Sequence, residues 1–379
     1  MIERIQTQNI QRWLADKKAV IVIGPRQVGK TTLVRQITQN APKSTLWLTG
    51  DDPETRNLLS NISLARLQLL IHQQDVVVID EAQRIVNAGL MLKLITDHFP
   101  QVQLFVTGSS SLDIAAQTKE NLTGRKLEYP LFPISFVEMC RYHGYATELS
   151  LLEQRMLYGY YPDVVQNNDA RAQRILNELS DGLMYKDLLS LDQIKKPALL
   201  VKLLQALALQ LGSEVSYTEV AQLIGADPAT VEKYIDLLEQ SFVLFRLPAL
   251  SRNARNEIKK GRKIYFYDNG IRNAILKNFA PLSLRTDTGA LWENFLLAER
   301  FKRNVYSEYF CNAYFWRTTT QQEIDYIEEA NGILHAFEFK WQAKKPVKFP
   351  AAFLDAYPNS VTEVIDRSNF ESFVGLEPV

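Results

Sequence analysis

Residues 19–31 read AVIVIGPRQVGKT, and this stretch decides the fold of the first part of the chain. Its opening AVIVI is a short apolar run, typical of a strand buried on both faces. The following GPRQVGKT fits the pattern G-x-x-x-x-G-K-[ST], in which backbone N–H groups and a helix N-terminus bind phosphate. We therefore predict a nucleotide-binding loop made of Gly24, Pro25, Arg26, Gln27, Val28, Gly29, Lys30, Thr31 and Thr32.

Four side chains are candidates for the chemistry at this loop. Lys30 carries the charge expected at the β- and γ-phosphates, and the Thr31 hydroxyl can ligate Mg²⁺. A second motif, VVVIDEAQ at 76–83, ends another apolar strand with two carboxylates. A carboxylate there is costly without a cation, so we assign Asp80 to magnesium and Glu81 to activation of the attacking water. The alternative is that both carboxylates cap the next helix.

Strand and helix patterns alternate through the first 135 residues. Strand-like runs lie at 19–23, 44–50, 75–80 and 102–108, and helical spacing at 31–37, 57–71 and in MLKLITDHF. This alternation predicts an α/β fold with a mostly parallel, three-layer sheet. The sequence has no N-K-x-D motif for reading guanine, which argues against a small GTPase.

Two further positions are candidates near the γ-phosphate. VTGSSS at 106–111 ends a buried strand with hydroxyls, so Ser109 or Ser110 is either a phosphate sensor or the N-cap of a helix. Arg125 follows a glycine turn. It is an arginine finger for its own chain or for a neighbouring subunit of a homo-oligomer, or else an ordinary surface arginine.

Helical patterns dominate from 136 to 211, and residues 212–270 resemble a winged helix. The helices YTEVAQLI and PATVEKYIDLLEQ, with Asp227 as the expected N-cap of the second, precede the strands FVLFRL and KIYFYD. The second helix is acidic and would repel DNA, whereas the wing, 246–263, is basic. Its cations are Arg246, Arg252, Arg255, Lys259, Lys260, Arg262 and Lys263. We expect DNA contact through this wing; the alternative is a packing or protein-contact module with a solvated wing.

A second candidate site lies near the C-terminus. Glu338 and Lys340 point to one side of a predicted strand, AFEFKW, while Asp325 in QEIDYI lies on a predicted antiparallel neighbour. Two carboxylates and a lysine can hold a divalent ion against a phosphodiester, and Glu293 in ALWEN can add a ligand. The alternative is ordinary charge alternation on an exposed sheet face.

Composition restricts the remaining possibilities. A chain of 379 residues predicts two to three domains, and 43 lysines and arginines balance 43 aspartates and glutamates, so no general attraction to nucleic acid follows. Cys140 and Cys311 are the only cysteines, which argues against a disulfide framework. We find no signal peptide and no membrane-spanning stretch, and expect a soluble cytoplasmic protein.

Taken in order, GPRQVGKT, VVVIDEAQ, VTGSSS, NLTGR, PLFPISFVE and YGYYPDVV resemble a bacterial and archaeal family of AAA-like P-loop ATPases. The second half resembles that family's C-terminal domain of unknown function in TVEKYIDLLEQ, KIYFYDNGIRNAI, GALWENFLLAER, FWRTTTQQEIDYI and FEFKW. One departure is YGYYPDVV, where a second glycine is expected before the tyrosine and proline, and it affects a turn more than the chemistry.

The resemblance implies an AAA-like core at 1–135, a helical region at 136–211, a winged helix at 212–270, and a PD-(D/E)xK nuclease-like (restriction-endonuclease-like) α/β domain at 271–379. It implies ATP and Mg²⁺ at Lys30, Thr31, Asp80 and Glu81, and a second divalent metal if Glu293, Asp325, Glu338 and Lys340 form a working nuclease site. The expected function is an ATPase that switches an attached, DNA-interacting module. The alternatives are an ATP-regulated, metal-dependent nuclease and a nucleotide-gated protein adaptor.

Overall fold

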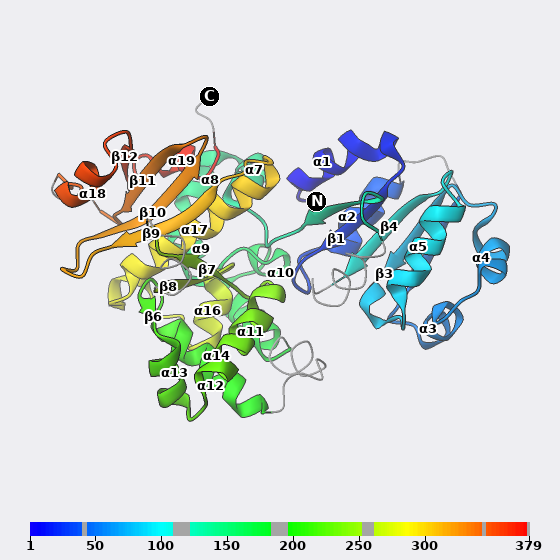
Figure 1. Ribbon diagram of the computed structural model, residues 1–379, viewed down its shortest axis with the longest axis horizontal. Coiled ribbons are helices and arrows are strands. Elements are labelled where there is room, and N and C mark those ends of the chain that lie inside the picture. The colour runs from blue at the N-terminus through cyan, green and yellow to red at the C-terminus, as the bar shows by residue number, and fades with distance from the viewer. Residues whose placement is uncertain (40–43, 109–121, 183–195, 252–260, 343–345, 377–379) are drawn as a thin grey trace. The chain divides into compact units, whose positions relative to one another are not determined.

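The computed structural model describes residues 1–39, 44–108, 122–182, 196–251, 261–342 and 346–376 (Figure 1). The chain forms two compact units. The N-terminal unit comprises Met1–Ile134 together with Gln240–Phe242, and the C-terminal unit comprises Ser135–Glu239 and Val243–Val379. None of the described helices is both long and apolar enough to cross a membrane.

The N-terminal unit is built on one sheet with the strand order β2-β3-β4-β1-β5. Every neighbouring pair in it is parallel, as the alternation of strands and helices predicts. The strands are β1 (Ala19–Ile23), β2 (Thr45–Thr49), β3 (Val76–Asp80), β4 (Gln103–Gly108) and β5 (Lys126–Pro130). Because β4 lies between β1 and β3, the loop after β1 and the acidic end of β3 meet at the same edge, on either side of the tip of β4.

Helices cover both faces of this sheet. One face, with Ile21, Val77 and Leu104, packs in a single apolar core with α3 (Pro53–Leu59), α4 (Leu64–Ile71) and α5 (Ala88–His98). On the other side α2 (Lys30–Gln39) packs against β4, and α1 (Ile5–Trp13) packs against α2. β1, β3 and β4 are buried along their whole length, which explains their nearly continuous apolar sequences.

Two features of this unit differ from the sequence-based expectation. The single helix expected at 57–71 is two helices, because Ser63 begins α4 with its hydroxyl accepting the Arg66 N–H at 3.4 Å. The sequence does not predict β5, since KLEYP has only partial apolar character. In the structure, Tyr129 is the one residue of this strand that is buried. Its parallel pairing with β1 makes it the strand at one edge of the sheet.

The C-terminal unit begins with helices. They are α7 (Phe136–His143), α8 (Tyr145–Ser150), α9 (Leu152–Tyr158), α10 (Pro162–Val165), α11 (Asp169–Gly182) and α12 (Pro197–Leu209). The predicted helix pair follows as α13 (Tyr217–Ile224) and α14 (Pro228–Gln240). Asp227 begins α14 as predicted, accepting the Thr230 N–H at 2.8 Å. A three-stranded sheet of order β6-β8-β7 accompanies them, made of β6 (Glu214–Val215), β7 (Leu244–Pro248) and β8 (Arg262–Phe266).

The rest of the unit is a second sheet, of order β12-β11-β10-β9, preceded by two helices (Figure 1). The helices are α16 (Asn269–Ile275) and the long α17 (Thr288–Tyr306). The antiparallel strands β9 (Asn312–Arg317), β10 (Glu323–Ala330) and β11 (Ile333–Phe339) follow. β12 (Val361–Ile365) pairs with β11 in parallel, after the short α18 (Ala351–Ala356) and before α19 (Phe370–Phe373).

Candidate functional sites

The loop between β1 and α2 has a backbone that only its glycines allow. A Cβ atom at Gly24 would lie 2.0 Å from the carbonyl oxygen of Leu131, the residue that follows β5. Gly29 has φ +94°, a conformation that residues with side chains rarely adopt. The two glycines therefore fix where the loop leaves β1 and where it enters α2.

Lys30 is the first residue of α2, and its side chain turns back into the loop. The residue is buried, and its Nζ donates to the carbonyl oxygens of Gly24 at 3.0 Å and Pro25 at 2.8 Å. The ammonium thus lies within the curve of the loop, beside the N-terminus of α2. Both the charge and the helix dipole favour an anion at this position.

Thr31 and Asp80 meet at the sheet edge, as the assignment of both to magnesium requires. The Thr31 hydroxyl donates to Asp80 Oδ1 at 2.9 Å and lies 3.1 Å from Oδ2. The carboxylate is largely buried at the end of β3. Thr107, near the end of β4, donates to Asp80 Oδ1 at 2.5 Å from the intervening strand. Two hydroxyls therefore hold one buried carboxylate in place.

Glu81 does not cap the helical turn that follows it. Its backbone is left-handed, with φ 51°, and its side chain makes no capping hydrogen bond to the turn Ala82–Arg84. The Glu81 N–H donates to the Thr107 hydroxyl at 3.0 Å, and the Gln83 amide donates to Glu81 Oε2 at 2.6 Å. The capping alternative is therefore not supported, and the carboxylate is oriented by Gln83.

The four residues predicted near the C-terminus, Glu293, Asp325, Glu338 and Lys340, lie together. Their three carboxylates and that of Glu323, which the sequence did not single out, form what we define as the carboxylate cluster. Asp325 Oδ2 accepts the Phe339 N–H at 2.8 Å, and Lys340 Nζ lies 2.7 Å from Glu338 Oε1. Burial raises the pKa of Glu293 to about 7, and the Asp325 carboxylate adds to this rise. Burial, followed by the effect of Asp325, also raises the pKa of Glu338.

Lys263 lies among these carboxylates, which corrects its assignment to a basic wing that contacts DNA. Its side chain is only 1% exposed, and its Nζ lies 3.1 Å from Glu293 Oε1 and 2.5 Å from Glu323 Oε1. Burial alone would lower the pKa of Lys263, but the carboxylates of Glu293, Asp325 and Glu323 outweigh burial and raise it. The Tyr265 hydroxyl, from the same strand, donates to Glu293 Oε1.

The other described cations of the wing are paired with the acidic helix α14. Arg246 Nη1 lies 2.7 Å from Asp236 Oδ1, and Arg246 also forms an ion pair with Glu239. Arg262 Nη1 lies 3.5 Å from Glu232 Oε1. These ion pairs join the acidic side chains of α14 to the basic side chains of the wing, so the charges of the two elements partly cancel. Arg252, Arg255, Lys259 and Lys260 lie outside the described residues.

The comparisons with known proteins divide the chain into three stretches. Residues 16–140 match the family described as an AAA domain. Residues 16–140 of the N-terminal unit thus resemble an AAA-type P-loop ATPase domain, and we refer to them as the AAA domain. Beyond this AAA domain, residues 149–282 and 288–370 match two families described as domains of unknown function, DUF8612 and DUF4143.

Two uncharacterised proteins are similar to this chain over most of its length. An uncharacterised protein of Mycobacterium tuberculosis is 27% identical over 341 residues, which cover 87% of this chain and 72% of that protein. An uncharacterised protein of Methanocaldococcus jannaschii is 23% identical over 324 residues, covering 79% and 70%.

Solved structures similar to the chain include a Walker-type ATPase of Pyrococcus abyssi, with 15% identity and a TM-score of 0.48, covering 73% of this chain and 96% of that one. The Holliday junction branch migration motor RuvB of Thermotoga maritima has 17% identity and a TM-score of 0.34, covering 74% and 96%.

Two residues of the N-terminal unit that the motifs did not identify support the site. Thr107 joins Asp80 to the backbone of Glu81, although its motif VTGSSS had drawn attention to the serines instead. Arg4, just before α1, has a buried guanidinium that donates to the carbonyl oxygens of Val28 at 2.8 Å and Phe132 at 2.6 Å. Only the contact across the fold reveals Arg4, because nothing in its local sequence marks it.

The two candidates near the γ-phosphate have different outcomes. Ser109 and Ser110 lie outside the described residues. Arg125 precedes β5, and its carbonyl oxygen accepts the N–H of Ala19, where β1 begins. This is the opposite end of β1 from the phosphate loop, and Arg125 Nε lies 2.9 Å from Asp97 Oδ1. The placement does not support a role at its own chain's loop, and a role toward a neighbouring subunit stays a prediction.

The two sites differ in how well they fit a metal ion. Thr31 and Asp80 present the hydroxyl and carboxylate oxygens that Mg²⁺ prefers when phosphate supplies further ligands. At the carboxylate cluster, in contrast, an ammonium already lies between two carboxylates. Throughout the described part of the chain, no three His, Cys, Asp or Glu side chains are placed together to hold a metal ion. The cluster therefore does not fit the second divalent metal expected there.

Proposed function

We propose that this protein hydrolyses Mg-ATP in its AAA domain and uses the nucleotide state to switch its C-terminal unit. The observation that carries this proposal is the meeting of Thr31 with Asp80, 2.9 Å apart, beside a loop that curls around the Lys30 ammonium. The Lys30 ammonium, which would bind phosphate, and the oxygens of Thr31 and Asp80, which would bind magnesium, lie at one edge of the sheet, and this supports phosphoryl transfer there.

Each residue has a defined role in this proposal. Lys30 and the N-terminus of α2 bind the β- and γ-phosphates of ATP. Thr31 and Asp80 would hold Mg²⁺, which when bound neutralises negative charge on the phosphates. Glu81, oriented by Gln83, accepts a proton from the attacking water. Thr107, on the neighbouring strand β4, holds the Asp80 carboxylate and the Glu81 backbone in place at the end of β3.

Two substitutions test the hydrolysis. Lys30→Ala should abolish ATP binding, whereas Glu81→Gln should keep ATP binding and lower kcat by about 10²–10⁴-fold, the usual contribution of a general base. Glu54→Gln, an exposed glutamate in the first turn of α3, is the matched control and should keep wild-type turnover. ATPase assays beside calorimetric ATP titrations give both quantities. Undiminished turnover in Lys30→Ala and Glu81→Gln would refute the assignment.

In the first form of this proposal, the C-terminal unit binds DNA. The support is the basic composition of residues 246–263, of which Arg252, Arg255, Lys259 and Lys260 lie outside the described part. The binding would be directed at phosphates and would weaken steeply with salt. ATPase rates measured at low and high salt, with duplex, single-stranded and four-way-junction DNA, test it. Stimulation by one form, lost at high salt, would identify DNA as the partner.

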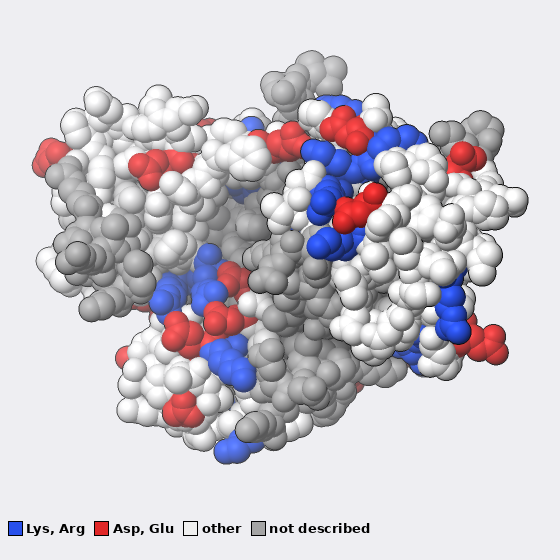
Figure 2. Space-filling view, turned by 45° about the vertical axis from the view of Figure 1, so that its right-hand side comes forward, with Lys and Arg blue, Asp and Glu red and all other residues white. Residues whose placement is uncertain are grey.

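A nucleotide-gated protein adaptor is the second candidate, and the ion pairs favour it. Arg246 and Arg262 are engaged with α14, and Lys263 is buried, so three wing cations are not available to phosphates. On the face drawn in Figure 2, lysines and arginines lie among aspartates and glutamates rather than in one positive field. This candidate predicts negligible DNA affinity even at low salt, where phosphate binding is strongest.

A further inference from the structure

Lys263 occupies the centre of the carboxylate cluster, and three elements meet around it. Its own strand, β8, belongs to the small three-stranded sheet, whereas Glu293 comes from α17 and Glu323 from β10 of the other sheet. The Lys263 ammonium bridges these two carboxylates at 3.1 Å and 2.5 Å. The ring of Phe315 lies 5.5 Å from the same nitrogen and covers it with an aromatic face.

Each carboxylate of the cluster already has a partner within the chain. Glu293 accepts from the Tyr265 hydroxyl as well as from Lys263, and Glu323 has a second cation in Arg317 at 3.5 Å. Asp325 accepts a backbone N–H, and Glu338 is paired with Lys340. A divalent ion would therefore enter a site in which three of the four carboxylates already pair with a cation of the protein.

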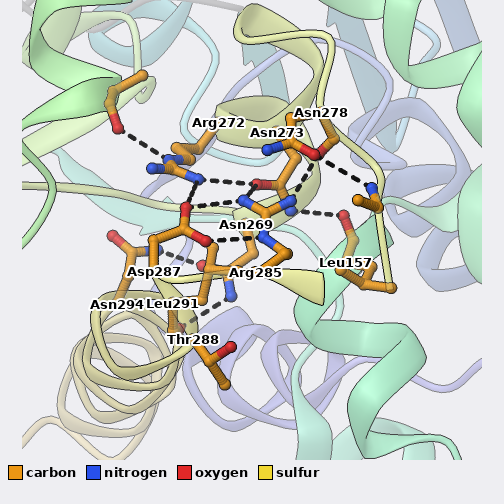
Figure 3. Close-up of polar contacts among 12 residues, drawn as sticks. Leu157, Asn269, Arg272, Asn273, Asn278, Arg285, Asp287, Thr288, Leu291 and Asn294 are labelled. Carbon is orange, nitrogen blue, oxygen red and sulfur yellow. Dashed lines mark hydrogen bonds and ion pairs between the residues drawn. The ribbon is translucent and has the colours of Figure 1, made fainter. Parts of the chain in front are cut away.

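The structure also fixes β8, and with it Lys263, against α17. The Asn294 side chain pairs with the backbone of Phe266, accepting its N–H at 2.7 Å and donating to its carbonyl at 3.0 Å. Asn294 also donates to Asn269, whose amide donates to the Leu291 carbonyl at 3.0 Å (Figure 3). Asn294 directly follows Glu293, so the same turn of α17 holds both the strand and the lysine's partner.

We propose that Lys263 is the resident cation of this cluster and takes the place that a divalent metal would need. The cluster is then an internal ion-pair centre joining β8, α17 and β10, and it does not cut phosphodiesters by metal catalysis. The proposal rests on the contacts of the C-terminal unit alone, so it stands or falls independently of ATP hydrolysis.

Titration of the nucleotide-free 379-residue protein with Mn²⁺ tests the proposal. The wild type and Asp325→Asn should bind Mn²⁺ alike, because the cluster takes none. Lys263→Met keeps the length of the side chain but removes its charge, and should gain a site that binds Mn²⁺ about tenfold or more tightly than the wild type. Adding Asp325→Asn to Lys263→Met should remove that gain, and the control Lys263→Arg, which keeps a cation, should show none.

Two results would overturn the proposal. One is Mn²⁺ binding by the wild type that Asp325→Asn abolishes, since the cluster would then accept a metal with Lys263 in place. The other is a folded Lys263→Met protein with no gain in Mn²⁺ affinity, since Lys263 would then not be what excludes the metal. Circular dichroism establishes folding. If Lys263→Met does not fold, Mn²⁺ binding by the wild type that Asp325→Asn abolishes would still overturn the proposal.

Discussion

Arg4 shows how one buried side chain can set the shape of a binding loop. Its guanidinium bridges the carbonyl oxygens of Val28, in the phosphate loop, and Phe132, beyond β5. A planar guanidinium can bridge two acceptors in fixed directions, whereas a lysine ammonium on a flexible stem does so poorly. The backbone N–H groups that must face the phosphates therefore depend on a residue before the first helix.

We expect Arg4→Lys to raise the KM for ATP by about tenfold, because a lost charge-assisted hydrogen bond is worth about 1.5 kcal/mol. The kcat should change much less, since Glu81 and its partners are untouched. Steady-state ATPase kinetics measure both constants, with the exposed Arg12→Lys of α1 as the matched control. A variant with a lower Tm but wild-type KM would show that Arg4 only stabilises the fold.

Asp287 gives a pH-dependent contribution to stability in the C-terminal unit. Burial alone would raise its pKa, but hydrogen bonds from Arg285 and Arg272 lower the pKa from 3.8 to about 2 (Figure 3). The folded protein then holds fewer protons on this group than the unfolded chain. The stabilisation is therefore complete above pH 3.8 and is lost as the pH falls through 2.

Asp287→Asn should accordingly lower the free energy of unfolding by about 1–2 kcal/mol at pH 7, since water partly screens this half-buried carboxylate. The difference from the wild type should shrink as the pH falls below about 4, where the unfolded chain takes up its proton. Urea unfolding from pH 7 to pH 3 measures this, with the exposed Asp355→Asn as control. A difference that stays constant with pH would contradict the charge pairing.

The residues that the sequence predicts lie in local motifs, whereas the residues that it misses depend on partners far along the chain. Gly24, Lys30, Thr31 and Asp80 belong to motifs in which spacing along the chain fixes spacing in the fold. Lys263 was misplaced because its partners lie on other elements, thirty residues or more along the chain. A basic residue in a basic stretch gives no local sign that it will be buried between two carboxylates.

At the scale of elements, strands buried on both faces were the easiest to predict. β1 was placed with its observed bounds, whereas β5 went unpredicted because an edge strand has fewer buried neighbours and a mixed sequence. The pattern at 57–71 predicts one helix, whereas the structure has two, because α3 ends at Leu59 and Ser63 caps the start of α4. Local periodicity thus predicts the type of an element better than its ends.

Asn294 connects two elements, and its loss should weaken the C-terminal unit. The residue is fully buried and completes the hydrogen bonds of Phe266 on β8. Asn294→Leu keeps the size but leaves a buried N–H and C=O without partners, which should lower the free energy of unfolding by about 2–4 kcal/mol. Urea unfolding measures this against the control Asn359→Leu, on an exposed turn. A loss below about 0.5 kcal/mol, typical of surface substitutions, would show that Asn294 does not join the elements.

At the scale of the whole molecule, the proposed switch makes a prediction that needs no assumption about how the two units are placed. A ligand can shift an equilibrium in the C-terminal unit only if that unit differs between nucleotide states. Glu81→Gln should hold ATP without hydrolysing it and so keep one state populated. Hydrogen–deuterium exchange should then change on Mg-ATP addition both in the AAA domain and in peptides of the C-terminal unit.

Lys30→Ala is the control for this measurement, because without ATP binding neither unit should change its exchange. Changes confined to residues 1–134 in Glu81→Gln would leave the ATPase assignment intact and remove the switch, since nucleotide binding would then have no effect on the C-terminal unit. Changes that extend to β8 and α17 would instead link nucleotide binding to the strand and the helix that hold Lys263 and Glu293 together. The residues that change their hydrogen–deuterium exchange therefore distinguish two cases. In one, nucleotide binding affects the AAA domain alone; in the other, it also changes the C-terminal unit.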